Sequence, residues 1–154
     1  MIPTPTSTLT TSSNPTWQRR GLTGLCWLLA LSFVAGAVAK FAPGETFAGA
    51  PYSEQFADWG YPSWFRFVVG SGEVVGVVLL LVPRRRFLGA ALLGVILVGA
   101  IVTHIVNQDP LSEAVMAPTC LALVGIVAYA SRPADWHQPL PAPRDGHRHQ
   151  SRPV

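Results

Sequence analysis

Long apolar segments alternate with short polar ones along most of this chain. Residues 21–39 carry no charged side chain, and residues 65–82, 87–106 and 114–130 carry few or none. Each segment has close to the roughly 20 residues that a helix needs to cross the hydrocarbon core of a bilayer. The pattern therefore predicts an all-α protein, a membrane four-helix bundle in which each segment forms one span.

The two ends of the chain have a different composition. Residues 1–20 are dominated by Thr, Ser and Pro, and residues 132–154 are rich in Pro, Arg and His. Segments of this kind bury too little apolar surface to fold. We therefore expect a disordered leader over 1–20, a membrane domain over 21–131 and a disordered tail over 132–154.

The overall composition agrees with a membrane protein and excludes several other classes. Hydrophobic residues make up 49% of the 154 residues and charged residues only 12%, with a net charge of +3. The basic residues are spread through tails and short loops, so nucleic acid is not an expected partner. Cys26 and Cys120 lie in apolar runs and form no CxxC pair, and His147 and His149 lack further ligands. We expect neither a disulfide nor a metal site.

The flanking charges predict the orientation of the spans. Lys and Arg accumulate in cytoplasmic loops. One set of flanks is basic: Arg19, Arg20, Arg84, Arg85, Arg86 and Arg132. The other set is acidic: Glu45, Glu54, Asp58, Asp109 and Glu113. Both termini are therefore predicted in the cytoplasm, with the bundle in the plasma membrane. The alternative is a cleaved signal ending at the Ala37-Val38-Ala39 site, although the long uncharged leader is atypical of one.

The first outer connection is predicted to contain a short helix. Pro51 suits a helix start, and Tyr52, Phe56 and Trp59 follow at a spacing that gives one apolar face. Gly60 is expected to end the helix. It would cover the mouth of the bundle, either as part of a site or as a lid without chemistry.

Small residues in the spans indicate close helix packing, because lipid tails leave helices to associate through close backbone approach. Pro118 in the last span is expected to kink it. The small-residue pairs are Gly72 and Gly76, Ala90 and Gly94, and Ala35 and Ala39.

Glu73 is the most informative polar residue. It lies about 12 Å into the second span at a rise of 1.5 Å per residue, where a carboxylate costs at least about 2.5 kcal/mol. Side chains lean toward the N-terminus of their helix, so Glu73, Lys40 and His104 all point to one region of the outer half of the bilayer. We predict an ion pair of Lys40 with Glu73, with Thr103 and His104 nearby. Arg66 is expected to meet outer head groups or Asp58.

These groups are the candidate site, and no metal is expected in it. Intramembrane ionisable groups are functional by default. The alternative is that a buried pair of Lys and Glu simply holds helices in register. No residue is assigned a catalytic role from these features.

An ordered set of residues from Gly21 to Arg132 resembles the DoxX-like branch of the DoxX family, small bacterial proteins with four membrane spans. The set comprises Lys40, Phe56, Gly60-Tyr61-Pro62, Phe65, Gly70, Gly72-Glu73, Gly76, Pro83-Arg84 and Thr103-His104. The resemblance implies a four-helix membrane bundle with Lys40, Glu73 and His104 at the family's polar positions. Some relatives serve in quinone-linked oxidation of sulfur compounds or in membrane redox complexes. The lack of a dithiol or a haem-type ligand pair here argues against self-contained redox chemistry.

Three hypotheses follow for function. The first is an accessory subunit of a quinone-linked redox system, with quinone as the candidate cofactor and a polar pocket in the outer half of the bilayer. The second is a component of proton-coupled transport of a small solute, and the third is a membrane assembly or scaffold protein. The expected partners are the lipid bilayer and either a second copy of the chain or a redox partner subunit. The sequence leaves open whether the chain is an enzyme.

Overall fold

The computed structural model describes residues 16–42, 44 and 51–132. The disorder expected for residues 1–15 and 133–154 lies outside these residues. Within them the chain forms helices and no strand, which confirms the all-α prediction. The helices are α1 (Thr16–Phe41), α2 (Tyr52–Asp58), α3 (Phe65–Leu81), α4 (Arg86–Val106), α5 (Leu111–Ala114) and α6 (Met116–Ser131).

Among the residues that the structure describes, three helical segments are long and apolar enough to cross a membrane. They are α1 with 26 residues, α4 with 21, and α5 and α6 together over the 21 residues Leu111–Ser131. Helix α3 is as apolar in character but has 17 residues, about 26 Å at the helical rise. The fourth span thus stays a prediction.

Helix α1 begins earlier than the sequence analysis predicted. Its first residue is Thr16, so residues 16–20, which we had assigned to the leader, are the first helical turn and the start of the next. The segment Gln18-Arg19-Arg20 contains two residue types with good helix propensity and no glycine or proline. Arg19 and Arg20 are predicted to end the leader because charged residues leave the bilayer core. A helix can nevertheless continue beyond the core when no glycine or proline interrupts it.

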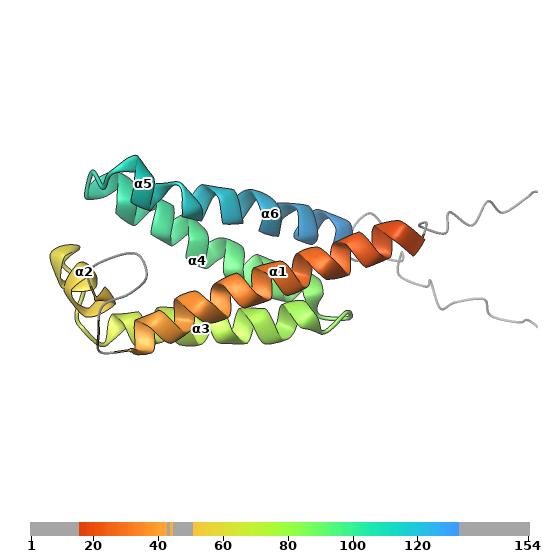
Figure 1. Cartoon of the computed structure of the whole chain (residues 1–154), viewed down its shortest axis with the longest axis horizontal. Coiled ribbons are helices and arrows are strands. Elements are labelled where there is room, and N and C mark those ends of the chain that lie inside the picture. Colours follow the sequence, from red (N-terminus) through yellow and green to blue (C-terminus); the bar gives the residue numbers. More distant parts are fainter. Residues whose placement is uncertain (1–15, 43, 45–50, 133–154) are drawn as a thin grey trace, which may run out of the picture.

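The four long helices run along one axis of the molecule (Figure 1). Helix α3 packs against both α1 and α4, α4 packs against α6, and α1 touches α6 less extensively. The beginning of α1, the connection from α3 to α4 and the end of α6 lie together at one end of the bundle, whereas α2 and α5 lie at the other (Figure 1). The basic flanks of the predicted spans and the acidic flanks that the structure describes therefore occupy opposite ends.

The interior of the bundle is apolar and the outer faces of its helices are apolar as well. The core includes Cys26, Leu29, Phe33, Val77, Leu80, Leu93, Leu97, Val124 and Val127. Large side chains that face outward include Trp27, Leu31, Val75, Val78, Val95, Val102 and Ile126. Helices that are apolar all round belong in a membrane, since water would not solvate these outer faces.

Helices α3 and α4 cross at small residues. Gly76, Gly89 and Ala90 are all buried there, and a Cβ atom at Gly89 would lie 2.7 Å from the carbonyl oxygen of Gly76. The predicted contribution of Gly76 and Ala90 is confirmed. On α1 the predicted pair was wrong, because Ala35 is exposed and the buried positions are instead Cys26, Leu29, Ala30, Phe33, Ala37 and Lys40.

The candidate span Leu111–Ser131 is broken near its beginning. Helix α5 ends at Ala114 and α6 begins at Met116. Pro118 explains the break, because proline has no N–H to bond the carbonyl of Ala114 and its ring crowds that carbonyl. The kink expected from Pro118 is thus present, and it separates α5 from the body of the span.

Candidate functional site

Lys40 and Glu73 form the ion pair that the sequence predicted. Lys40 Nζ lies 3.0 Å from Glu73 Oε2 and 3.1 Å from Oε1, and it also approaches the carbonyl oxygen of Gly36 at 3.5 Å. Both residues are buried, at 8% and 6% exposure. The pair joins the last turn of α1 to the middle of α3, so each charge is compensated inside the fold.

Helix α2 covers this pair from one side. The Lys40 ammonium lies 4.8 Å from the centroid of the Tyr52 ring, a cation–π contact. Phe56, the buried residue of α2, packs its ring on those of Tyr52, Trp59, Tyr61 and Phe65, with centroids 5.3 to 6.3 Å apart. The short helix that the sequence predicted is therefore present, and its aromatic face lies on the bundle.

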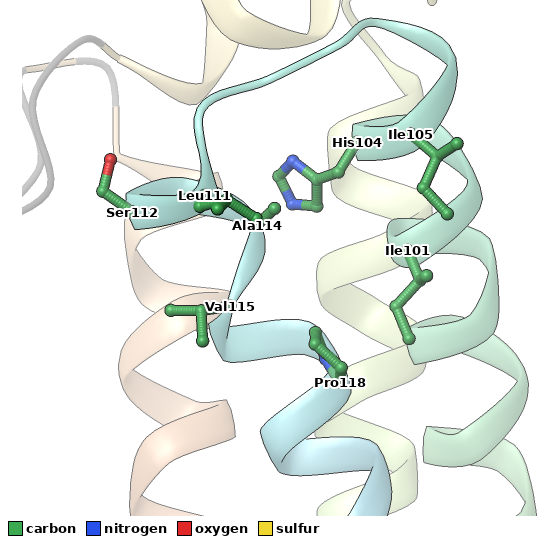
Figure 2. Close-up of a pocket in the computed structure, with 8 residues that line it drawn as sticks. All are labelled: Ile101, His104, Ile105, Leu111, Ser112, Ala114, Val115 and Pro118. Atoms are coloured by element: carbon green, nitrogen blue, oxygen red, sulfur yellow. The ribbon is translucent and has the colours of Figure 1, made fainter.

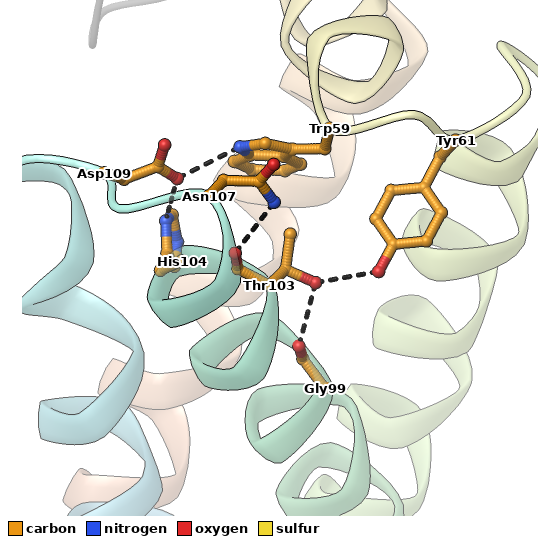
Figure 3. Close-up of polar contacts among 7 residues, drawn as sticks. All are labelled: Trp59, Tyr61, Gly99, Thr103, His104, Asn107 and Asp109. Atoms are coloured by element: carbon orange, nitrogen blue, oxygen red, sulfur yellow. Dashed lines mark hydrogen bonds and ion pairs between the residues drawn. The ribbon is translucent and has the colours of Figure 1, made fainter.

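The end of α2 turns the chain so that two aromatic side chains reach α4. Gly60 adopts a left-handed conformation with φ of 78°, which a glycine adopts without steric cost. Trp59 precedes this turn and Tyr61 follows it, with Tyr61 N–H donating to the carbonyl oxygen of Phe56. Trp59 then contacts Asp109 in the turn after α4, and Tyr61 contacts Thr103 in the last turn of α4 (Figure 3).

His104 and Asp109 form the second polar pair. His104 Nδ1 lies 2.7 Å from Asp109 Oδ2, and Trp59 Nε1–H donates to the same oxygen at 3.0 Å (Figure 3). The Trp59 and His104 rings also meet edge to face, with centroids 5.3 Å apart. A carboxylate only accepts hydrogen bonds, so His104 Nδ1 carries the proton in this contact.

The turn after α4 brings Asp109 back to His104. Gln108 has a φ of 56°, in the left-handed region, and the backbone N–H of Asp109 donates to the carbonyl oxygen of His104. Asn107 adds a bond from its Nδ2 to the carbonyl oxygen of Thr103 at 2.9 Å. The last carbonyl groups of α4 thus accept hydrogen bonds from the Asn107 side chain and the Asp109 N–H. This turn holds the Asp109 carboxylate beside the imidazole.

Thr103 links α4 to the residue that follows the α2 turn. Its hydroxyl donates to the carbonyl oxygen of Gly99 at 3.0 Å, and it lies 2.9 Å from the Tyr61 hydroxyl. Because the single Thr103 proton is used by Gly99, Tyr61 donates to Thr103. Thr103 therefore helps to attach the segment that follows α2 to α4. Its hydroxyl contacts, with Gly99 and Tyr61, are structural.

An apolar groove of about 520 Å³ lies between α4 and the α5–α6 segment. Its lining residues are Ile101, His104, Ile105, Leu111, Ser112, Ala114, Val115 and Pro118. Figure 2 shows the imidazole of His104 projecting from α4 toward Leu111 and Ala114, with Val115 and Pro118 further along the groove. The break before α6 opens this space, because α5 and the first turn of α6 do not continue one straight helix along α4.

The sequence-predicted residues therefore fall into separate groups. Lys40 and Glu73 are together in the interior, whereas His104 bonds Asp109 and lines the groove on another face of α4. Arg66 donates to the carbonyl oxygen of Ala42 at 3.2 Å and stacks on Phe67, rather than making the expected contact with Asp58. Its predicted contact with head groups stays a prediction.

Sequence reasoning missed the immediate partners of His104. Asp109 had been assigned only to the outer charge pattern and Trp59 only to an aromatic belt. A signal was present, since the Asn107-Gln108-Asp109 segment, which begins three residues after His104, allows a tight turn that returns the carboxylate to the last helical turn. The indole donor could not have been found in this way, because its placement depends on how α2 packs.

Comparison with known proteins identifies the family. The model of the DoxX-like family matches residues 24–128, most of the membrane domain. The chain belongs to the DoxX-like family. No curated protein and no solved structure matches it.

Membership of the DoxX-like family and the apolar helices establish a membrane protein. The match begins inside α1 and ends inside α6, so it includes both polar pairs and the groove. Among the described residues of this DoxX-like chain, no three His, Cys, Asp or Glu side chains are placed to hold a metal ion. The chemistry that these residues offer is hydrogen bonding and proton exchange.

The indole bond to Asp109 is open to a direct test. Replacing Trp59 with Phe keeps an aromatic ring against His104 but removes the N–H donor. We expect a loss of about 1.5–3 kcal/mol of local stability, as for a hydrogen bond to a charged group. Faster amide hydrogen exchange over residues 52–61 than in the unchanged chain would show it, and exchange at an unaltered rate would contradict it.

Proposed function

We propose that this DoxX-like protein is an accessory membrane subunit that binds a quinone in the groove between α4 and the α5–α6 segment. The observation that carries the proposal is an imidazole, held by a carboxylate, at the end of an apolar groove. Quinone molecules combine an apolar tail with a head group of two oxygen atoms. Ligand sites are typically apolar clefts of about 300–1,000 Å³ with few polar groups.

His104 has the hydrogen-bonding capacity that such a head group needs. With Nδ1–H donating to Asp109, the neutral imidazole has a free acceptor at Nε2. Nε2 can accept a hydrogen bond from a hydroxyl and, once protonated, donate one to a carbonyl. Asp109 holds the ring through its Nδ1, and Trp59 fixes the orientation of Asp109. A bound quinone would supply the electron-carrying chemistry; the residues of the chain orient the head group and exchange the proton.

The proposal includes four spans with both termini in the cytoplasm of the plasma membrane. The 17 residues of α3 lie at the lower limit of membrane-spanning length, and α3 packs between α1 and α4, which are themselves span candidates. A helix that packs between two membrane-spanning helices is expected to lie in the bilayer with them. The gathering of basic flanks at one end of the bundle and acidic flanks at the other supports the orientation.

The ion pair of Lys40 and Glu73 remains part of the candidate site in this proposal. Its charges are satisfied by each other, so its direct effect is to hold α1 on α3. The α2 aromatic residues contact Lys40 at one end and His104 at the other, through Tyr52 and Trp59. Glu73 is thus connected to the His104 region by packed side chains, and proton handling by Glu73 stays a proposal.

Quinone retention by the purified protein tests the function. We expect the wild-type chain, extracted in mild detergent, to retain quinone detectable by chromatography of its lipid extract. His104→Ala is expected to reduce retention at least tenfold, because it removes the imidazole that lines the groove. Asp109→Asn should give an intermediate loss, because the amide can still bond the ring.

Glu73→Gln is the comparison that locates the site. The amide side chain can still accept from Lys40, so the fold should be kept and groove binding should change little. Retention lost in Glu73→Gln but kept in His104→Ala would place the ligand at the buried pair and contradict the groove. No retained quinone in any well-folded preparation would remove the redox proposal, and Glu73-dependent proton flux in vesicles would favour transport.

A further inference from the structure

The basic end of the bundle carries arginines from three separate parts of the chain. Arg19 and Arg20 lie in the first turns of α1, Arg84 and Arg85 in the connection from α3 to α4, and Arg132 directly after α6. All five are exposed, and their segments meet at one end of the molecule (Figure 1). We refer to these five residues as the arginine collar.

The run of three arginines divides into two roles. Arg86 is half-buried and its Nε–H donates to the carbonyl oxygen of Leu80 at 3.2 Å, so it satisfies the end of α3. Arg84 and Arg85 are exposed. Satisfying this helix end needs one arginine, and the other two remain available on the surface.

The collar faces no acidic side chain within the described residues. The described carboxylates are Glu54, Asp58, Glu73, Asp109 and Glu113, which belong to α2, α3 and the α4–α5 region toward the other end. Trp17 is 69% exposed in the first turn of α1, as is usual for a residue at the level of lipid head groups. The collar is thus a concentrated positive surface at the membrane interface.

We propose that the arginine collar binds anionic phospholipid head groups. Arginine donates several hydrogen bonds in a planar arrangement that matches phosphate oxygens. Clustered basic residues next to membrane helices attract anionic lipids, each contributing about a fivefold preference near the surface. The lipid would bridge the beginning of α1, the α3–α4 connection and the end of α6, which lie at one end of the bundle. This proposal depends neither on the groove nor on quinone.

The test compares lipid binding of the full chain and of two double variants. Native mass spectrometry would count phosphatidylglycerol and phosphatidylcholine retained from mixed micelles of equal composition. We expect a clear preference for phosphatidylglycerol, lowered about 25-fold in Arg84→Gln/Arg85→Gln and reduced by 0.5 M salt. Arg84→Lys/Arg85→Lys keeps the charge and is the matched control, for which most of the preference should remain.

Several outcomes would overturn the proposal. Equal retention of both lipids by the wild-type chain is one, and an unchanged preference in the glutamine variant is another. Displacement of phosphatidylglycerol by inorganic phosphate would indicate an ion site rather than a lipid surface. Loss of a bound acidic protein or nucleic acid from the glutamine variant, with lipid retention unaltered, would assign the collar to a different partner. Circular dichroism of both double variants would check that they are folded.

Discussion

Lys40→Met is expected to lower the free energy of unfolding by about 3–5 kcal/mol, the usual effect of breaking a buried ion pair. The Glu73 carboxylate is 6% exposed, and the partner that the structure gives it is Lys40. Without the ammonium it is a charge without compensation inside an apolar bundle. Denaturation in mixed detergent micelles, followed by loss of helical circular dichroism, measures the change.

A double-mutant cycle measures the coupling free energy between the two charges, apart from the effect of each substitution alone. Lys40→Met/Glu73→Leu removes both charges and keeps apolar volume, so it should recover most of the lost stability and can approach the wild-type value. Glu113→Gln is the control, because Glu113 is exposed and its change should stay below about 0.5 kcal/mol. Losses that simply add in the double variant would show that the two charges are not coupled.

Gly89→Ala should be the most damaging single-methyl change in the bundle. A Cβ atom there would meet three backbone positions of α3, at 2.7 Å from the oxygen of Gly76, 2.8 Å from the carbonyl carbon of Leu79, and closer still to the nitrogen of Leu80. Backbone atoms cannot rotate away as side chains do, so α3 and α4 must separate. We expect a loss of about 3 kcal/mol in the same unfolding measurement.

Two other glycines provide graded controls for this contact. At Gly76 the added Cβ would lie 2.6 Å from Leu93 Cδ2, a side-chain atom that can move, so Gly76→Ala should cost less than Gly89→Ala. Gly99 lies on the same helix as Gly89 and has nothing within 4 Å. Gly99→Ala should therefore be neutral or stabilising by up to about 1 kcal/mol. Equal effects at Gly89 and Gly99 would contradict the close crossing of α3 and α4.

The ion pair could be predicted from sequence because its argument needed only depth and direction. Lys40 ends an apolar segment, Glu73 lies eight positions after the start of the next one, and the helices run in opposite directions. A buried carboxylate requires a cation, and Lys40 was the cation at a matching height. The helical interpretation of residues 52–58 succeeded for a similar reason, since the proline, the apolar spacing and the glycine are all local signals.

His104 could not be placed in the same way because height does not determine the angle around a helix. Consecutive residues are about 100° apart, so Thr103 faces the bundle while His104 faces the groove beside α5. The position of α5 depends on the break caused by Pro118, and the approach of Asp109 depends on the left-handed Gln108. Both are properties of the folded backbone that charge patterns do not contain.

The close crossing at Gly89 was missed for a related reason. Small residues four apart predict a contact at Ala90 and Gly94, whereas in the structure Gly89 lies against Gly76 and the next residue, Ala90, is buried. Adjacent small residues are equally able to admit a backbone when the crossing point falls between them. The spacing rule identified the correct helices and an incorrect register.

Photochemical labelling with a quinone that carries an azide on its head group tests the central claim most directly. Binding in the groove predicts labelled peptides from residues 101–105 and 111–118, labelling that excess unmodified quinone suppresses, and a large decrease in His104→Ala. An azide on a plain alkyl chain of equal length controls for partition into lipid. Labels confined to other faces of the bundle, or equal to those of the alkyl control, would contradict a quinone site at His104.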